Sequence, residues 1–141
     1  MKKKHLAALL ILAAAAAVIC LFLLRPFSRP AEVRMWIDGQ EAELPLSPPE
    51  TEDLRVFLTL DGKEIAVFPF GEPHTVRILQ SSGDENTLRI GEAGVVMESA
   101  NCEGQDCVHM EEVTRDNLET RVMFGMIICL PHRLSVEVRQ E

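Results

Sequence analysis

The feature that most constrains this chain is an uninterrupted apolar run from Leu6 to Leu24, which is 19 residues without a charge. At about 1.5 Å per residue, a helix of this length spans roughly 28 Å, close to the hydrocarbon thickness of a bilayer. A helix packed in a soluble core usually keeps a polar face, and this run has none. The run predicts a transmembrane helix at about residues 6–24, inside an N-terminal part that ends with a short linker at residue 30.

The flanks of this run indicate an uncleaved signal anchor. A secretory signal peptide has an apolar region of only about 7–15 residues and then a small-residue cleavage site, which the sequence RPFSRP does not offer. Cys20 follows Ile19 rather than a small residue, so a lipidated cysteine is not expected. Three lysines, at positions 2–4, precede the run. By the positive-inside rule, the N-terminus lies in the cytoplasm and the remainder outside the cell membrane, in a single-pass arrangement.

The segment after the anchor is strongly acidic. Residues 31–141 hold all 22 Asp and Glu but only nine Lys and Arg, a net formal charge of −13. Such a charge repels phosphate backbones, so no nucleic-acid partner is expected. It also repels anionic lipid surfaces, which leaves the N-terminal helix as the membrane attachment. A protein partner outside the membrane remains compatible with this charge.

Short alternating segments separated by turn residues dominate this acidic part. Asp38-Gly39 and Asp61-Gly62 each lie between alternating apolar residues, which predicts two hairpins. Further extended segments are expected at 74–79, at 87–99 with a turn marked by Gly91 and Gly94, at 123–130 and at 133–140. No long segment has a helical period, although parts of 107–129 are compatible with a short helix. The sequence predicts an all-β domain, a small sandwich or barrel-like fold. Residues 31–53 are interpreted as an extra hairpin with a proline-rich linker.

Three cysteines and one histidine form the pattern C-x4-C-x21-C-x2-H, made by Cys102, Cys107, Cys129 and His132. Three thiolates and an imidazole are a ligand set of zinc, and the spacing of the last two resembles that of known ligand pairs. The first spacing is at the upper end of the usual range. One interpretation of the pattern is therefore a site for zinc or another metal; no other cofactor is expected.

The same cysteines allow two other interpretations. In an oxidising compartment, Cys102 and Cys107 are the first candidates for a disulfide, which would contribute roughly 2 kcal/mol across so short a loop. Cys129 is then unpaired, or it pairs with Cys102 and leaves Cys107 free. A redox site is the third interpretation, although the acidic residues between the first two cysteines would raise a thiol pKa there rather than lower it.

No pattern in the sequence indicates catalysis. A glycine-rich phosphate loop, a Ser-His-Asp arrangement and an HExxH pattern are all missing from it, and no carboxylate is singled out by its spacing. We expect a protein that is not an enzyme and has no catalytic residues. Its expected role is a membrane-anchored interaction or accessory module. The alternative is a redox or metal-binding module that uses Cys102, Cys107, Cys129 and His132.

Three stretches resemble a known family: LDGKEIAVFPF, LRIGEAGVVMESANCEGQDCV and IICLPHRLSVEV. They are similar to the NusG domain II-like family of small membrane-anchored or exported bacterial proteins. The resemblance covers residues 54–139 and leaves the first hairpin, 33–46, outside it. Glu103 stands where the family usually has proline, and 110–125 lacks the family's glycine-tryptophan-like stretch.

The resemblance implies a compact β domain, like the second domain inserted in some NusG transcription factors. It does not imply transcription, because an exported acidic domain would not meet RNA polymerase. Fold analogy alone does not deliver a function. Some relatives are associated with flavin-attachment or membrane redox systems, so the resemblance implies a membrane-associated electron-transfer context for the redox or metal alternative.

Overall fold

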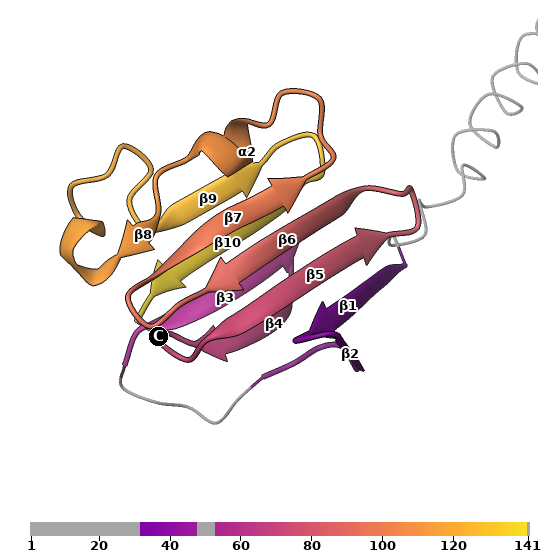
Figure 1. Ribbon diagram of the computed structural model, residues 1–141, viewed down its shortest axis with the longest axis horizontal. Helices are drawn as coiled ribbons and strands as arrows, with labels where there is room; N and C mark the ends of the chain where they lie inside the picture. The colour runs from indigo at the N-terminus through magenta and orange to yellow at the C-terminus, as the bar shows by residue number, and fades with distance from the viewer. Residues whose placement is uncertain (1–31, 48–52, 141) are drawn as a thin grey trace, which may run out of the picture. The chain divides into compact units, whose positions relative to one another are not determined.

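The computed structural model describes residues 32–47 and 53–140, which form two antiparallel β-sheets (Figure 1). The prediction of an all-β domain is confirmed for these residues. Neither sheet closes on itself within the described ranges, so the barrel-like form of the prediction is not what the chain adopts. No helix in the described ranges is long and apolar enough to cross a bilayer. The predicted anchor at 6–24 lies outside those ranges.

The larger sheet has six strands in the order β2-β1-β5-β6-β7-β8. Its strands are β1 (Val33–Ile37), β2 (Gln40–Ala42), β5 (His74–Gln80), β6 (Glu85–Ile90), β7 (Gly94–Ala100) and β8 (Val113–Thr114). The smaller sheet has four strands in the order β4-β3-β10-β9. They are β3 (Arg55–Leu60), β4 (Lys63–Pro69), β9 (Met126–Cys129) and β10 (Leu134–Arg139).

Both Asp-Gly pairs form the tight hairpin turns that the sequence predicts. Asp38 and Gly39 have φ angles of 51° and 84° between β1 and β2, and Asp61 and Gly62 have 53° and 77° between β3 and β4. Positive φ at both central residues matches the right-handed twist of the flanking strands. The two hairpins lie in different sheets, so each contributes one side of the core.

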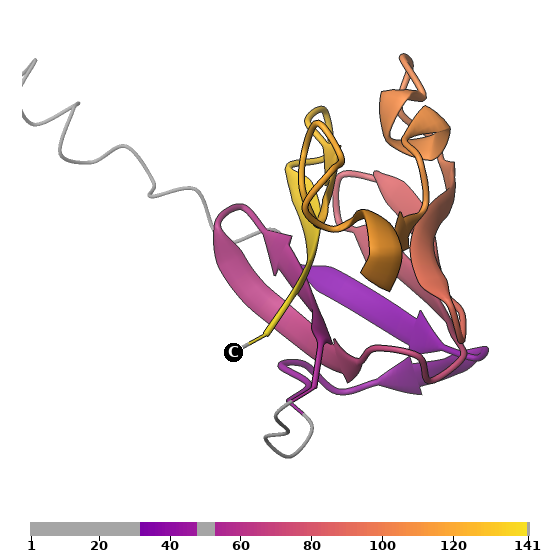
Figure 2. The same ribbon diagram turned by 90° about the vertical axis from the view of Figure 1, so that its left-hand side faces the viewer.

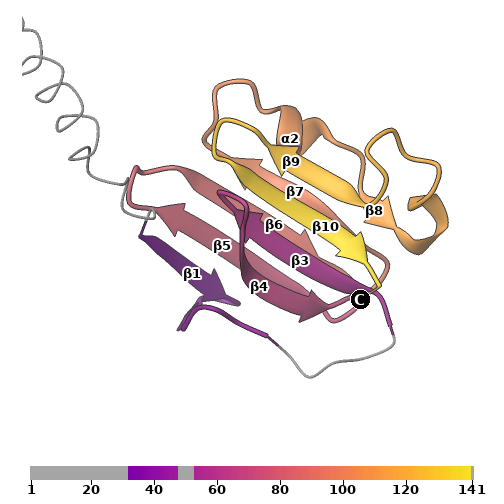
Figure 3. The ribbon, with the colours of Figure 1, turned by 180° about the vertical axis from the view of Figure 1, so that it is seen from behind.

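The core lies between the two sheets, which Figure 2 shows as two layers seen from the side. Figure 3 shows the smaller sheet nearer the viewer. Alternate residues of β5 and β10 point inward, including Val76, Ile78, Leu134 and Val136, none more than 1 % exposed. Burying each such side chain contributes about 1.5–3 kcal/mol. This alternation is the pattern from which the strands were predicted.

The first hairpin is part of the larger sheet, because β1 pairs with β5 from Val33↔Gln80 to Ile37↔Val76. Met35 on β1 is fully buried. Trp36 points to the opposite face, where the guanidinium groups of Arg34 and Arg77 lie 4.9 Å and 5.1 Å from its ring. Residues 31–141 form one compact unit that includes this hairpin.

Helical structure in the described ranges is limited to two short turns, α2 (Asp106–His109) and η1 (Arg115–Asn117). Both lie in the long connection from β7 to β9. The short helix expected within 107–129 is therefore limited to these two turns. The connection carries Cys102 and Cys107 and leads to Cys129.

Candidate thiol site

Three separate elements position the three cysteines. Cys102 lies two residues after the end of β7, Cys107 is in α2, and Cys129 is the last residue of β9. α2 contacts both β7 and β9, so it bridges the two sheets at this end of the molecule. Cys129 pairs with Leu134 of β10, which fixes its position within the smaller sheet.

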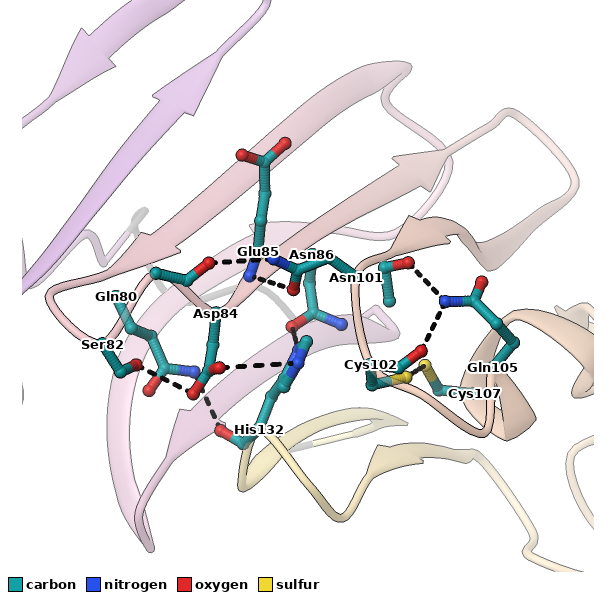
Figure 4. A network of polar contacts seen from close by, with 12 residues as sticks. Gln80, Ser82, Asp84, Glu85, Asn86, Asn101, Cys102, Gln105, Cys107 and His132 are labelled. Carbon is teal, nitrogen blue, oxygen red and sulfur yellow. Dashed lines mark hydrogen bonds and ion pairs between the residues drawn. The ribbon is translucent and has the colours of Figure 1, made fainter.

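Two amide side chains hold the loop that carries Cys102. The Asn101 side chain accepts a hydrogen bond from the Glu85 backbone at 2.8 Å and donates to the Gly83 carbonyl at 2.9 Å. Gln105 has a φ of 56°, and its Nε2 donates to the carbonyl oxygens of Ala100 and Cys102 at 2.5 Å and 2.7 Å (Figure 4). The loop backbone is therefore tied both to the β5–β6 turn and to itself.

The sulfur atoms of Cys102, Cys107 and Cys129 all lie within 4.8 Å of one another. The Sγ atoms of Cys102 and Cys107 are 3.8 Å apart, and all three cysteines are free thiols. They are 6 %, 1 % and 1 % exposed, respectively. The structure thus assembles three of the four residues of the sequence pattern into one buried triangle of sulfur.

Burial sets the acidity of the central thiol. Burial, together with the neighbouring thiols of Cys129 and Cys102, raises the pKa of Cys107 to about 12. A thiolate without a counter-ion is poorly stabilised in such a site, because the charge is desolvated. Cys107 is therefore protonated and a weak nucleophile at neutral pH.

A small, partly enclosed pocket of about 50 Å³ borders the sulfur triangle. All three cysteines line it, together with Gln105 and Leu130. Leu130 is 78 % exposed, so this wall of the pocket reaches the protein surface. The pocket gives a small ligand a route to the sulfur atoms.

His132 does not join the sulfur triangle. Its Nδ1–H donates to Asn86 Oδ1 at 2.7 Å, and its Nε2 lies 3.8 Å from Asp84 Oδ1. Its carbonyl oxygen accepts from Gln80 Nε2 at 2.9 Å. Figure 4 shows the imidazole pointing toward Asn86 and Asp84. Both ring nitrogens thus face other groups, and the histidine clamps the β9–β10 turn to β5 and β6.

The disulfide between Cys102 and Cys107 stays a prediction. Their Sγ atoms are 3.8 Å apart, whereas a disulfide bond is about 2.05 Å long, so the two cysteines are adjacent but not bonded. Sequence reasoning overlooked the clamps made by Asn101 and Gln105. The sequence did offer a signal, because Asn101 stands beside Cys102 and Gln105 stands between Cys102 and Cys107. Amide side chains in tight loops often form hydrogen bonds to backbone groups.

The sequence and structure are similar to those of known proteins. The family model described as NusG domain II matches residues 6–141. A solved DUF1312 family protein from Ruminococcus gnavus is 30% identical over 61% of this chain and 97% of its own, with a TM-score of 0.48. A second, from Enterococcus faecalis, is 23% identical over 62% and 98%, with a TM-score of 0.54.

The Lin0431 protein from Listeria innocua is 19% identical over 62% of this chain and 97% of its own, with a TM-score of 0.53. No curated protein matches the chain. The likeness to the Enterococcus and Listeria structures supports the two-sheet fold. Because the family match covers most of the sequence, the chain belongs to the NusG domain II family.

Proposed function

We propose that Cys102, Cys107 and Cys129 bind a soft or borderline metal ion, Zn²⁺ or Cu⁺, as three thiolate ligands. The observation that carries the proposal is the convergence of three buried sulfur atoms within 4.8 Å from three separate elements. Thiolates are the protein ligands that these two ions prefer. The proposal keeps three residues of the sequence-predicted set and omits His132.

The size of the triangle supports this proposal. Zinc–sulfur bonds of about 2.3 Å in a tetrahedron separate neighbouring sulfur atoms by about 3.8 Å. The Cys102–Cys107 distance is 3.8 Å, and the largest separation does not exceed 4.8 Å. Side-chain rotations that shorten the longest sulfur–sulfur separation by at most about 1 Å would bring three thiolates onto one ion.

The raised pKa of Cys107 favours metal binding over thiol redox chemistry as the function of the site. Its pKa of about 12 opposes nucleophilic redox chemistry, which requires a thiolate. A bound cation stabilises the thiolate form of Cys107, so a coordinating thiol loses its proton to the solvent. Binding would therefore release protons, and affinity would rise with pH.

The pocket beside the triangle supports an open fourth position. Structural zinc sites have four protein ligands, whereas zinc sites with three protein ligands leave the fourth position for a water or another small ligand. Three cysteines and a 50 Å³ pocket fit the second arrangement. A small donor such as water, or a thiol group, fits this space better than a fourth side chain of this chain.

The wider role that we propose is a non-enzymatic accessory module. Residues 6–24 would anchor it, and the acidic domain would lie outside the cell membrane. The apolar run, its three preceding lysines and the charge of the domain support this placement. In this role the domain would hold or hand on a metal ion near other membrane proteins.

A Cys102–Cys107 disulfide is the second candidate for the same residues, favoured by their 3.8 Å separation. A low-molecular-weight disulfide would accept the two electrons, and both thiol protons would pass to the two released thiols. The closed disulfide would leave Cys129 as a single thiol. Because only one ligand would remain, oxidation would abolish metal binding.

Metal titration of the reduced full chain in mild detergent tests the proposal. Competition of Zn²⁺ or Cu⁺ with a chelating dye should give one ion per chain. Serine at any one of Cys102, Cys107 or Cys129 should weaken binding at least a hundredfold. His132→Gln is the matched control and should bind as tightly as the unsubstituted chain. Weak binding by a chain with three free thiols would refute the proposal.

A further inference from the structure

A second surface of the domain is unusually apolar. Val122 is 94 % exposed and Phe124 67 %, with the 38 % exposed Met123 between them. We refer to these three residues as the apolar turn. Together with Leu130, they are the exposed large hydrophobic residues of the described ranges. Adjacent exposed apolar side chains mark interaction surfaces, whereas isolated ones are ordinary.

The apolar turn has a fixed backbone. The guanidinium of the buried Arg121 donates to the carbonyl oxygens of Phe124 and Met126 at 2.7 Å and 3.1 Å, and also to that of Glu111. Phe124 has a φ of 50°, a left-handed conformation that costs about 1 kcal/mol or more for such a residue. Its ring is thus displayed by an ordered, strained turn. A preorganised surface loses less entropy when it binds.

A groove of about 320 Å³ lies beside the apolar turn. Met110, Val122 and Met123 form apolar walls, and Glu111 adds an exposed carboxylate. Methionine side chains adapt to different partners, which suits a binding groove. Arg121 also lines the groove, but its guanidinium is already engaged with three carbonyl oxygens.

The surroundings of the groove are acidic. Exposed carboxylates follow along the chain at Asp116 and Glu119. Apart from Arg121, the cationic residue of 110–125 is Arg115. Its guanidinium lies 3.6 Å from the carboxylate of Asp53. The whole of 31–141 carries a net charge of −13. A complementary partner therefore combines positive charge with at least one apolar side chain.

We propose that the apolar turn and its groove dock a basic, amphipathic segment of a partner protein. An apolar side chain of the partner occupies the groove between Met110 and Val122, and its Lys or Arg side chains pair with Glu111 and neighbouring carboxylates. The inference rests on the accessory role proposed above and does not depend on the metal site. A second copy of this acidic chain and an anionic bilayer are both repelled from the same surface.

The test uses the full chain in mild detergent and a fluorescent helical peptide built from Leu and Lys. We expect binding that weakens as salt rises. The double substitution Val122→Ser with Phe124→Ser should weaken it at least tenfold, and Glu111→Gln about threefold with a shallower salt dependence. Leu130→Ser removes an equally exposed apolar group elsewhere and should leave peptide affinity unchanged.

Other outcomes overturn the inference. Equal weakening by Leu130→Ser would mean unspecific adhesion, and no weakening in the double variant would place the peptide elsewhere. Self-association that the double variant abolishes would assign the surface to a second copy. Quenching of a Phe124→Trp side chain by spin-labelled phosphatidylcholine, above that of Trp36 alone, would assign it to lipid. Metal binding by the double variant should be unchanged, so failure here leaves the thiol proposal standing.

Discussion

His132 and Asn86 are joined by a 2.7 Å hydrogen bond from the imidazole Nδ1–H to the side-chain Oδ1. The bond links the β9–β10 turn of one sheet to β6 of the other. Asn86 is 1 % exposed and also donates to Met97 Sδ at 3.5 Å. The histidine nearest in sequence to Cys129 therefore has a structural partner of its own.

We predict that His132→Ala destabilises the domain without weakening metal binding. The substitution leaves the buried Asn86 oxygen without its donor and opens a void, at a combined cost of about 2–3 kcal/mol. Urea unfolding of the reduced, metal-free chain measures this loss. His109→Ala, at an exposed position, is the control and should change stability by less than about 0.5 kcal/mol. Equal stability of the two variants would contradict the clamp.

We predict that Gly125→Ala is strongly destabilising. A Cβ at this position would lie 2.3 Å from the Val138 carbonyl oxygen and 2.9 Å from a Leu118 methyl group. Backbone must shift to make room, which we expect to cost about 3 kcal/mol. Gly83→Ala is a matched control with a φ of 91° and no atom within 4 Å of the added Cβ, so only conformational strain of about 1 kcal/mol applies. The ranking of the two thermal midpoints checks the prediction, and a reversed order would refute it.

The stability of the metal-free domain should fall at high pH because of Cys107. Its folded-state pKa of about 12 lies above the ordinary value of 9.0, so the folded state holds a proton that the unfolded state loses between these values. Stability is fully present below about pH 9 and declines by at most about 1.4 kcal/mol per pH unit toward pH 12. Cys107→Ser should flatten this slope in unfolding experiments. An unchanged slope in that variant would mean that Cys107 titrates normally.

The sequence allows much of this fold to be predicted. The turns at Asp38-Gly39 and Asp61-Gly62 follow from local conformational preference, and the alternation in β5 and β10 follows from burying one face of each strand. The pairing of β1 with β5 depends on contacts between distant segments, which local patterns do not specify. For the same reason, two sheets and a closed barrel were indistinguishable before the structure.

The candidate site, too, was predicted only in part from the sequence. Cysteines at 102, 107 and 129 were grouped by residue type and spacing, and their sulfur atoms do converge. His132 was grouped with them by a spacing of two residues. The turn after β9 instead points its ring toward Asn86, because Gln80 holds the His132 carbonyl. Which way a turn residue points is decided by its tertiary partners.

The membrane placement makes a prediction of its own. With residues 6–24 as an anchor and lysines at positions 2–4 on the cytoplasmic side, a reporter fused after Glu141 should be active only outside the cell membrane. A phosphatase that requires export provides one readout, and a fluorescent protein that folds only in the cytoplasm provides the opposite one. Cytoplasmic activity of the fusion would contradict the predicted topology.

X-ray absorption at the zinc edge of the Zn²⁺-loaded full chain tests the central claim most directly, because it counts the ligands by element. The account predicts three sulfur scatterers at about 2.3 Å and one nitrogen or oxygen scatterer, without the outer-shell signal of an imidazole. His132→Gln should give the same spectrum. A shell of oxygen and nitrogen alone, or an imidazole signal that disappears in His132→Gln, would contradict the three-thiolate site.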